Sequence, residues 1–150
     1  NDTDPARHEP HYQEITRPDQ VQIYESVLLD SNDEITTGLL DAVQYVKDNR
    51  VLPLGFDKTS ADDQIAVRGS AFTDPDFQGG SDQVRYVIDV DDQAGPLTIE
   101  VSLWYQPIGY RWADNMRAYD APEPQRFVSY YESMSSASGF ILASSSLTVK

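Results

Sequence analysis

Two groups of acidic residues lie in loops that also contain glycine or serine, a setting that can gather oxygen ligands around calcium. The first group is Asp57, Asp62 and Asp63, and the second is Asp74, Asp76 and Asp82. Neither group has the DxDxDG spacing of a calcium-binding loop. The alternative interpretation is a solvated acidic surface, and calcium is the one cofactor that these loops predict for the chain itself.

The two histidines are the other candidate metal ligands, and both lie near the N-terminus. A neutral imidazole is a good axial ligand to haem iron, so His8 and His11 could serve a haem that is carried elsewhere. The alternative is that both rings are solvated in a charged segment. The chain has no cysteine, so it has neither a CxxCH motif for covalent haem attachment nor a thiol nucleophile.

The sequence assigns no catalytic residue. Any two of the 25 acidic residues could form the acid pair of a glycoside hydrolase, which makes that pattern unspecific. The serines at 144–146 lack a GxSxG context. A non-catalytic role is therefore favoured. The alternative is an extracellular hydrolase or a calcium-binding module that acts through the acidic loops.

Aromatic and basic residues are concentrated in the segment LWYQPIGYRWADNMRAYDAPEP at 103–124. Exposed tryptophan, tyrosine and arginine often anchor protein interfaces. The predicted partner-binding residues are Tyr110, Arg111, Trp112 and Arg117. The alternative is that the aromatic side chains close the end of a sheet. We expect Trp104 to be structural, beneath a helix, and Trp112 to lie nearer the surface.

The first half of the chain gives mixed signals for the elements that would position these residues. The polar, proline-containing segment 1–20 predicts an extended arm, and alternation over 21–30 predicts a strand before a turn. Leu39, Leu40, Val43 and Val46 recur at helical spacing, which favours a short helix within 36–53. The segment 55–80 predicts a long loop with one short strand at 64–72.

The second half gives clearer patterns. Alternating apolar residues over 83–90 and 97–106, separated by DDQAGP at 91–96, predict an antiparallel hairpin. Apolar residues at helical spacing predict a helix that starts near Pro122, and the segment after Gly139 suits a closing strand or an extended tail. The predicted core comprises Val84, Tyr86, Ile88, Ile99, Val101, Leu103, Phe127 and Tyr131.

Charge and composition narrow the range of partners. The formal net charge of −14 would repel nucleic acid and anionic membranes. No apolar run is long enough for a membrane span, so membrane insertion is not expected. The start NDTDPARHEPHYQ has no initiator methionine, which favours a fragment of a longer precursor. The composition does not predict an oligomeric state.

Five strings resemble the C-terminal part of a family of bacterial exported proteins related to multihaem c-type cytochromes. The strings are VQIYES, TTGLLDAVQYVKDNRVLPLGFDK, FQGGSDQVRY, LWYQPIGYRWADN and YDAPEPQRFVSYYE, and the resemblance runs from about Asp4 to Ser136. In that family the CxxCH haem motifs lie upstream of such a segment. The resemblance implies a periplasmic or secreted protein, with haem carried only by an upstream region or a partner.

Together these observations predict a mainly β fold, with α+β as the alternative. We expect an antiparallel sheet or partial β-sandwich with two or three short helices, formed as a single domain over 21–150. The favoured function is a non-catalytic accessory or interaction domain. The resemblance associates it with periplasmic electron transfer, through a haem-bearing region or partner protein.

Overall fold

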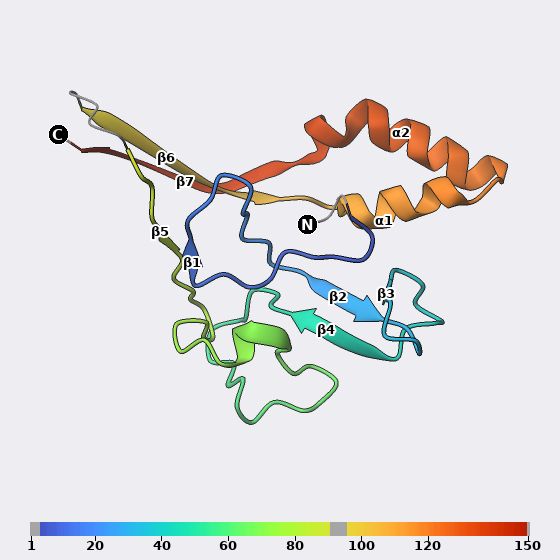
Figure 1. Cartoon of the computed structure of the whole chain (residues 1–150), viewed down its shortest axis with the longest axis horizontal. Coiled ribbons are helices and arrows are strands. Elements are labelled where there is room, and N and C mark those ends of the chain that lie inside the picture. The colour runs from blue at the N-terminus through green and yellow to red at the C-terminus, as the bar shows by residue number, and fades with distance from the viewer. Residues whose placement is uncertain (1–3, 91–95, 150) are drawn as a thin grey trace. The chain divides into compact units, whose positions relative to one another are not determined.

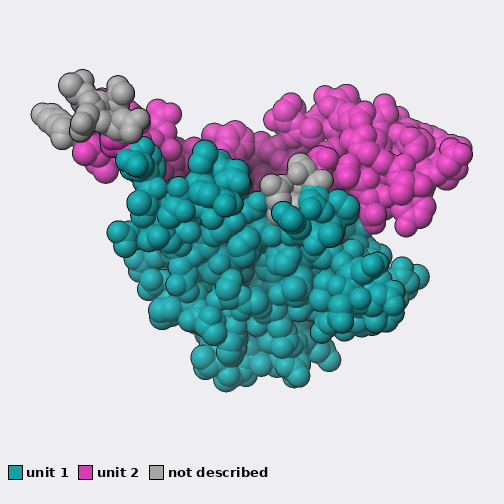
Figure 2. Space-filling view, in the orientation of Figure 1, with its two compact units in different colours: residues 1–89 teal, residues 90–150 magenta. Residues whose placement is uncertain are grey.

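The computed structural model describes residues 4–90 and 96–149. The chain divides into two compact units, Asn1–Asp89 (unit 1) and Val90–Lys150 (unit 2), which Figure 2 shows in different colours. The sequence predicted an arm over 1–20 and one domain over 21–150, whereas the boundary between the compact units falls at residue 90. Each unit is therefore described separately.

Unit 1 contains two small sheets (Figure 1). In the three-stranded sheet, β2 is central and pairs antiparallel with β3 and β4. In the second sheet β1 and β5 pair in parallel, which joins the beginning of unit 1 to its end. The elements of unit 1 are β1 (Glu14–Ile15), β2 (Ser26–Leu29), β3 (Ile35–Thr36), β4 (Gln44–Asp48), the 3₁₀ helix η1 (Gly69–Phe72) and β5 (Arg85–Tyr86).

The predicted N-terminal arm is packed into unit 1. Ile15 pairs in register with Tyr86, and its backbone oxygen accepts a hydrogen bond from the Val87 amide at 2.9 Å. Ile15 is buried, as are the polar residues Glu9 and His11. The predicted arm is therefore part of the folded unit, because its backbone pairs with residues at the end of unit 1 and some of its side chains are buried there.

The hydrophobic core of unit 1 forms mainly in the segment predicted to be a long loop. Leu52, Val67, Ala71 and Phe77 form one buried cluster, against which Tyr24 and Phe56 pack. The predicted strand at 64–72 is instead a single bridge at Arg68 followed by η1. Packing of its apolar side chains, rather than β-sheet hydrogen bonding, stabilises this segment.

Two adjacent glycines allow the loop to approach its own start. A Cβ atom on Gly79 would lie 2.7 Å from the backbone nitrogen and oxygen of Phe56, closer than real Cβ atoms come. Gly80 has φ of 90°, a conformation that side chains disfavour, and its amide donates to the Leu52 oxygen at 2.9 Å. Only glycine suits both positions.

The helix predicted within 36–53 is wrong. Part of this segment forms β4, and Leu40 is 101% exposed, so the residues at helical spacing do not share a buried face. Within β4 the side chain of Lys47 is buried. Its ammonium donates to the Ile23 backbone oxygen at 2.8 Å and to the Glu25 carboxylate at 3.0 Å, which ties β4 to the segment before β2. Sheet pairing with β2 outweighs the weak helical pattern.

Unit 2 is a long antiparallel ribbon whose two strands are connected through helices (Figure 1). The strands pair from Leu97 with Val149 through to Tyr105 with Phe140. The predicted helix near Pro122 and the predicted closing strand are both confirmed. The elements are β6 (Leu97–Tyr105), α1 (Tyr110–Asn115), the 3₁₀ helix η2 (Met116–Ala118), α2 (Pro122–Ser138) and β7 (Phe140–Val149).

The predicted hairpin between 83–90 and 97–106 is wrong. β5 pairs with β1 and β6 pairs with β7, so the two segments never pair with each other. Most of the predicted turn, residues 91–95, lies outside the described residues. Alternation identified β6 as a strand but carried no information on its partner, which is 35 or more residues further along the chain.

The predicted core is also wrong for most of its members. Tyr86, Ile88, Ile99, Val101 and Leu103 are exposed, whereas Val84 is half-buried. Phe127 and Tyr131 are half-buried on α2, with their rings stacked 6.4 Å apart. The buried hydrophobic residues of unit 2 among those described are Ala113 and Val128. The alternating pattern therefore indicates an apolar surface rather than an interior.

At the level of fold class the structure is a mixed α+β arrangement of small, mostly antiparallel sheets and short helices. This agrees with the α+β alternative and confirms the coarse prediction of antiparallel strands with short helices. Among the described residues, no helix combines the length and the apolar character that a membrane crossing requires.

Replacement of Phe77 should destabilise unit 1 strongly. We expect Phe77→Ala to lower the free energy of unfolding by about 3–5 kcal/mol, because it leaves a cavity in the central cluster. Urea denaturation followed by near-ultraviolet circular dichroism would measure the change. The control Leu40→Ala removes a fully exposed side chain and should change stability by no more than about 0.5 kcal/mol. Equal stability of the two variants would contradict this core assignment.

Candidate functional site

A buried polar centre lies at the middle of unit 1. The His11 Nε2 atom lies 3.0 Å from Asp74 Oδ2 and 3.8 Å from Asp82 Oδ1, and the His11 and Asp74 side chains are fully buried. His11 comes from the N-terminal segment, and the two carboxylates come from either end of the loop after η1. The ring also packs edge-on against Phe77, with centroids 4.9 Å apart.

Two side-chain amides fix the tautomer of His11. Its Nδ1 atom lies 2.9 Å from Gln22 Nε2 and 3.0 Å from Asn49 Nδ2. The amide orientations are themselves fixed, because Gln22 Oε1 accepts from the Tyr12 amide and Asn49 Oδ1 accepts from the Glu25 amide. Nδ1 therefore faces N–H donors and must be an acceptor, so the ring proton lies on Nε2 and is donated to Asp74.

This tautomer does not fit a metal centre. His11, Asp74 and Asp82 are the one set of three potential ligands that lies close together among the described residues. Metal binding at Nε2 would move the ring proton to Nδ1, where a metal-bound histidine normally donates to an acceptor. Here Nδ1 meets two donors instead. The cluster is a hydrogen-bonded structural centre in which Nε2–H is already committed.

The carboxylates of this centre are likewise occupied by donors. Asp74 Oδ1 accepts from the Asp76 amide at 2.9 Å. Asp82 Oδ2 accepts from the Tyr24 hydroxyl at 2.6 Å, and Asp82 Oδ1 accepts from the Gln83 amide at 2.8 Å. Calcium requires six to eight oxygen ligands, which two carboxylates engaged in this way do not supply. The sequence predicted Asp74, Asp76 and Asp82 as calcium ligands. The Asp74 and Asp82 carboxylates accept hydrogen bonds in this structure, and calcium binding by this group stays a prediction.

The other acidic group forms local turns. Asp57 accepts from the Thr59 hydroxyl, the Ser60 hydroxyl and the Thr59 amide, and these bonds lower its carboxyl pKa to about 2. Asp62 accepts from the Gln64 amide, and Asp63 pairs with Arg68 at 3.1 Å. These three carboxylates form no common ligand set in the described structure. Calcium binding therefore stays a prediction.

The prediction that a histidine ligates haem iron fits the geometry of His8 and His11 to different degrees. His11 is enclosed with both ring nitrogens hydrogen-bonded, so it offers no atom to an iron outside unit 1, and its predicted role does not fit this geometry. His8 is half-buried beside a cavity of about 400 Å³ that is also lined by Tyr12 and Arg17. For His8 axial ligation stays a prediction.

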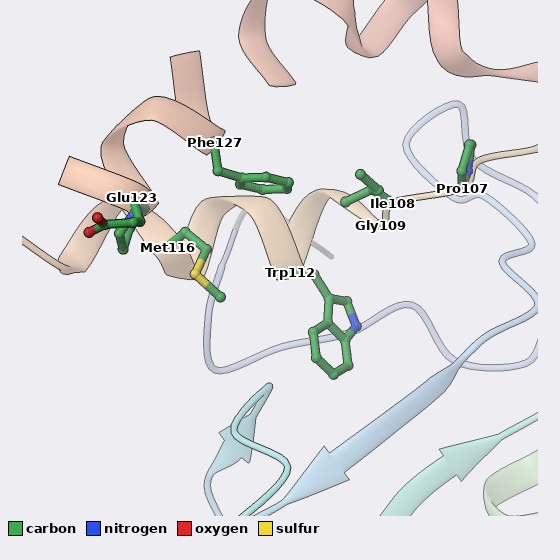
Figure 3. Close-up of a pocket in the computed structure, with 8 residues that line it drawn as sticks. Pro107, Ile108, Gly109, Trp112, Met116, Glu123 and Phe127 are labelled. Atoms are coloured by element: carbon green, nitrogen blue, oxygen red, sulfur yellow. The ribbon is translucent and has the colours of Figure 1, made fainter. Parts of the chain in front are cut away.

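A second candidate site lies in unit 2, where the chain leaves β6 and enters the helices. An apolar groove of about 660 Å³ is formed there by α1, η2, α2 and the segment before α1. Figure 3 shows Phe127 of α2 over α1, with Ile108 and Pro107 on the segment that enters that helix. The lining residues are Pro107, Ile108, Gly109, Trp112, Met116, Glu123, Pro124 and Phe127. Such a volume and lining are typical of binding sites for apolar groups.

The four predicted partner-binding residues have different roles around this groove. Trp112 lines it and is 37% exposed, and Tyr110 is exposed with its hydroxyl 3.3 Å from Asp114. Arg117 forms ion pairs with Asp114 and with Glu132 of α2, which raise its guanidinium pKa, so it holds η2 against α2. Arg111 is half-buried on α1. Trp112 and Tyr110 are thus available to a partner, whereas Arg117 braces the helices.

Some expectations about this surface need correction. Trp104 is 59% exposed, more than Trp112, so it is not the buried residue that the sequence predicted. The sequence also missed Met116 and Ile108 as groove residues, and it missed Gln22 and Asn49, which fix the His11 tautomer. No spacing signal marks these residues. The groove residues meet only once α1, η2 and α2 pack together, and Gln22 and Asn49 lie 11 and 38 residues from His11 along the chain.

Comparisons with known proteins add no further assignment: no family model, curated protein or solved structure matches the chain.

The fixed tautomer of His11 can be tested by nuclear magnetic resonance. Long-range proton–nitrogen correlation at neutral pH should show His11 protonated at Nε2 and unprotonated at Nδ1, because Nδ1 faces two amide donors. Added zinc should leave this pattern unchanged, and His8, the chain's other histidine, provides an internal comparison. A proton on Nδ1 of His11 would contradict the assigned tautomer, and a zinc-induced shift of its ring would show that the centre binds metal.

Two tyrosines of unit 1 make stability sensitive to alkaline pH. Burial and a hydrogen bond to Glu9 raise the pKa of Tyr12 to about 12, and burial with the bond to Asp82 raises the pKa of Tyr24 further above its usual 10. The folded state therefore holds these protons more tightly than the unfolded chain does. Their contribution is complete below about pH 10 and is lost as the pH rises through the folded values.

We expect the urea midpoint of unit 1 to fall from about pH 10 to about pH 12. The variant Tyr24→Phe should be less stable at neutral pH, because Asp82 loses a donor, and its stability should depend less steeply on pH above 10. The matched control is Tyr119→Phe, which changes an exposed tyrosine of unit 2. An identical alkaline slope in wild type and Tyr24→Phe would exclude Tyr24 as a source of the effect.

Proposed function

We propose that the chain is a non-catalytic interaction module that docks through unit 2. The observation that carries this proposal is the exposure of apolar surface in two places, the residues that alternate along β6 and β7 and the separate groove that Trp112 lines. Large exposed apolar patches on a folded protein commonly mark interaction sites. The polar groups of the buried centre in unit 1 are engaged in hydrogen bonds with one another, which supports a structural role for that centre within this proposal.

The partner in this proposal is a haem-bearing protein of the periplasm. The support is the resemblance to the C-terminal part of exported multihaem cytochrome-like proteins, together with the lack of any cysteine for covalent haem in this chain. A partner with a basic rim around an apolar patch would complement the net charge of −14. The predicted partial β-sandwich is also part of this proposal. A partner that packs against the apolar face of the β6–β7 ribbon would supply the second layer of such a sandwich.

Binding to a multihaem c-type cytochrome would test the proposal. We expect calorimetry to show binding that Trp112→Ala weakens by about 2 kcal/mol, roughly 30-fold, since a half-exposed tryptophan in an apolar groove is a typical anchor. Tyr119→Ala is the matched control, because Tyr119 is exposed but does not line the groove.

Two results would count against the proposal. One is the absence of binding by the wild-type chain. The other is equal binding by Trp112→Ala and wild type, which would remove the groove as the docking element. Unfolding curves of both variants would confirm that the fold is retained, since neither side chain is buried.

A further inference from the structure

The β6–β7 ribbon has two chemically different faces. Facing pairs such as Thr98 with Thr148 and Ser102 with Ser144 carry hydroxyl groups, and Glu100 with Ser146 lies between them. The pairs that alternate with these are mostly aliphatic. They are Leu97 with Val149, Ile99 with Leu147, Val101 with Ser145 and Leu103 with Ala143. The ribbon is therefore amphipathic, and its apolar face is exposed in the described structure.

A bulge limits the regular part of β7. Leu103 pairs with Ala143, but the next residue, Trp104, pairs with Ile141, so Leu142 is an extra residue in β7. A bulge of this kind interrupts the ladder and ends regular pairing on that strand. The stretch with uninterrupted alternation is therefore ASSSLTV, residues 143–149.

The outer edge of this stretch is an open hydrogen-bonding surface. Among the described residues β7 pairs with β6 alone, and every residue of β7 is exposed. Proteins usually protect such edges with lysine, proline or inward charges. Residues 140–149 contain no charged residue and no proline. β6 differs because it carries the carboxylate of Glu100, so β7 has the less protected edge.

We propose that β7 pairs with β7 of a second copy of this chain, antiparallel and about a twofold axis at Ser146. A twofold axis perpendicular to the sheet keeps the apolar faces of both copies on the same side. Because the odd-numbered residues of β7 lie on the apolar face, each odd-numbered residue must then face an odd-numbered residue of the second copy. Only an axis centred on residue 146 satisfies this requirement and pairs the whole stretch 143–149. The product is a four-stranded sheet in the order β6, β7, β7, β6.

The side chains brought together in this register are compatible. Ala143 faces Val149 of the second copy, and Ser145 faces Leu147 of the second copy, both on the apolar face. Ser144 faces Thr148 of the second copy on the polar face, where hydroxyl pairs are favourable. Ser146 faces itself, and its small side chain leaves the axis free of steric conflict. The pairing also doubles the apolar face that the proposed function uses, but it does not depend on that function.

Charge gives the association a definite dependence on salt. Each copy carries −14, so two copies repel one another at low ionic strength, while the paired strands themselves are uncharged. Salt screens this repulsion. The dimer should therefore become tighter as the salt concentration rises, opposite to a complex held by surface ion pairs.

A cysteine at the axis would test the register directly, because the chain has no other cysteine. In Ser146→Cys the two thiols face each other with Cβ atoms about 4.5–5.5 Å apart, near the spacing of a disulfide. Oxidised glutathione, which accepts the two electrons and two protons, should cross-link this variant rapidly. The matched control is Ser102→Cys, on the same polar face but on β6, and it should not cross-link.

A second pair of variants tests the edge without oxidation. Ser146→Lys places a cation opposite its own copy across the axis, while Glu100 compensates it within the monomer. Its dimer dissociation constant, measured by light scattering with size-exclusion chromatography, should rise about tenfold or more over wild type. Ser102→Lys adds the same charge to β6 and should leave the constant nearly unchanged.

Three results would overturn the proposal. The first is a wild-type chain that stays monomeric at every protein and salt concentration up to its solubility limit. The second is equal cross-linking of Ser146→Cys and Ser102→Cys, which would indicate random collision or pairing through β6. The third is a wild-type dimer that Ser146→Lys leaves intact. Loss of cytochrome binding with an intact dimer would contradict only the proposed function.

Discussion

Unit 1 depends on the hydrogen bond from His11 Nε2 to the buried carboxylate of Asp74. The bond joins residues 63 positions apart and places the N-terminal segment against the loop that carries Phe77. A buried carboxylate is tolerated only with donors around it, and a buried imidazole only when both nitrogens are satisfied. His11 meets both conditions because Gln22 and Asn49 fix its proton on Nε2. The hydrogen bonds that join the segments of unit 1 also engage both ring nitrogens of His11 and both oxygens of Asp74, so a residue combination typical of a metal site here organises a fold.

Unit 2 is stabilised differently, and this difference explains why the functional proposals lie there. Its ribbon is a two-stranded antiparallel ladder with one bulge, and nearly all of its residues are exposed in the described structure. A two-stranded ribbon alone is marginally stable in water. Arg117 of η2 forms an ion pair with Glu132 of α2, and the rings of Phe127 and Tyr131 stack within α2. An amphipathic ribbon joined to a braced helical groove leaves apolar surface that a partner or a second copy can bury.

Local signals in the sequence predicted α2 and the existence of β6 and β7, because periodicity and proline position are properties of short segments. Partners were not predictable in this way. β6 was assigned to its neighbour along the chain but pairs with β7. β4 was assigned to a helix because Leu39, Leu40, Val43 and Val46 recur at helical spacing, whereas the buried contacts of β4 are made by the polar residue Lys47. For the candidate site the sequence predicted Asp74 and Asp82 together in one acidic group, and His11 separately as a haem ligand. The arrangement of these residues as one cluster depends on contacts across the whole of unit 1. So do the Gln22 and Asn49 amides, which place the ring proton of His11 on Nε2.

The charge of the chain is divided unevenly between the two units, and this affects how each surface can act. Residues 1–89 contain 18 acidic and 7 basic residues, a net charge of −11, whereas residues 90–150 contain 7 and 4, a net charge of −3. The near-neutral unit is the one with exposed apolar residues, so desolvation there costs little, while unit 1 supplies the long-range field. A basic partner would be attracted by that field and bind more weakly as salt is added, whereas self-association would strengthen. The two contacts therefore respond to salt with opposite sign, which lets one titration distinguish docking on a partner from pairing of the ribbons.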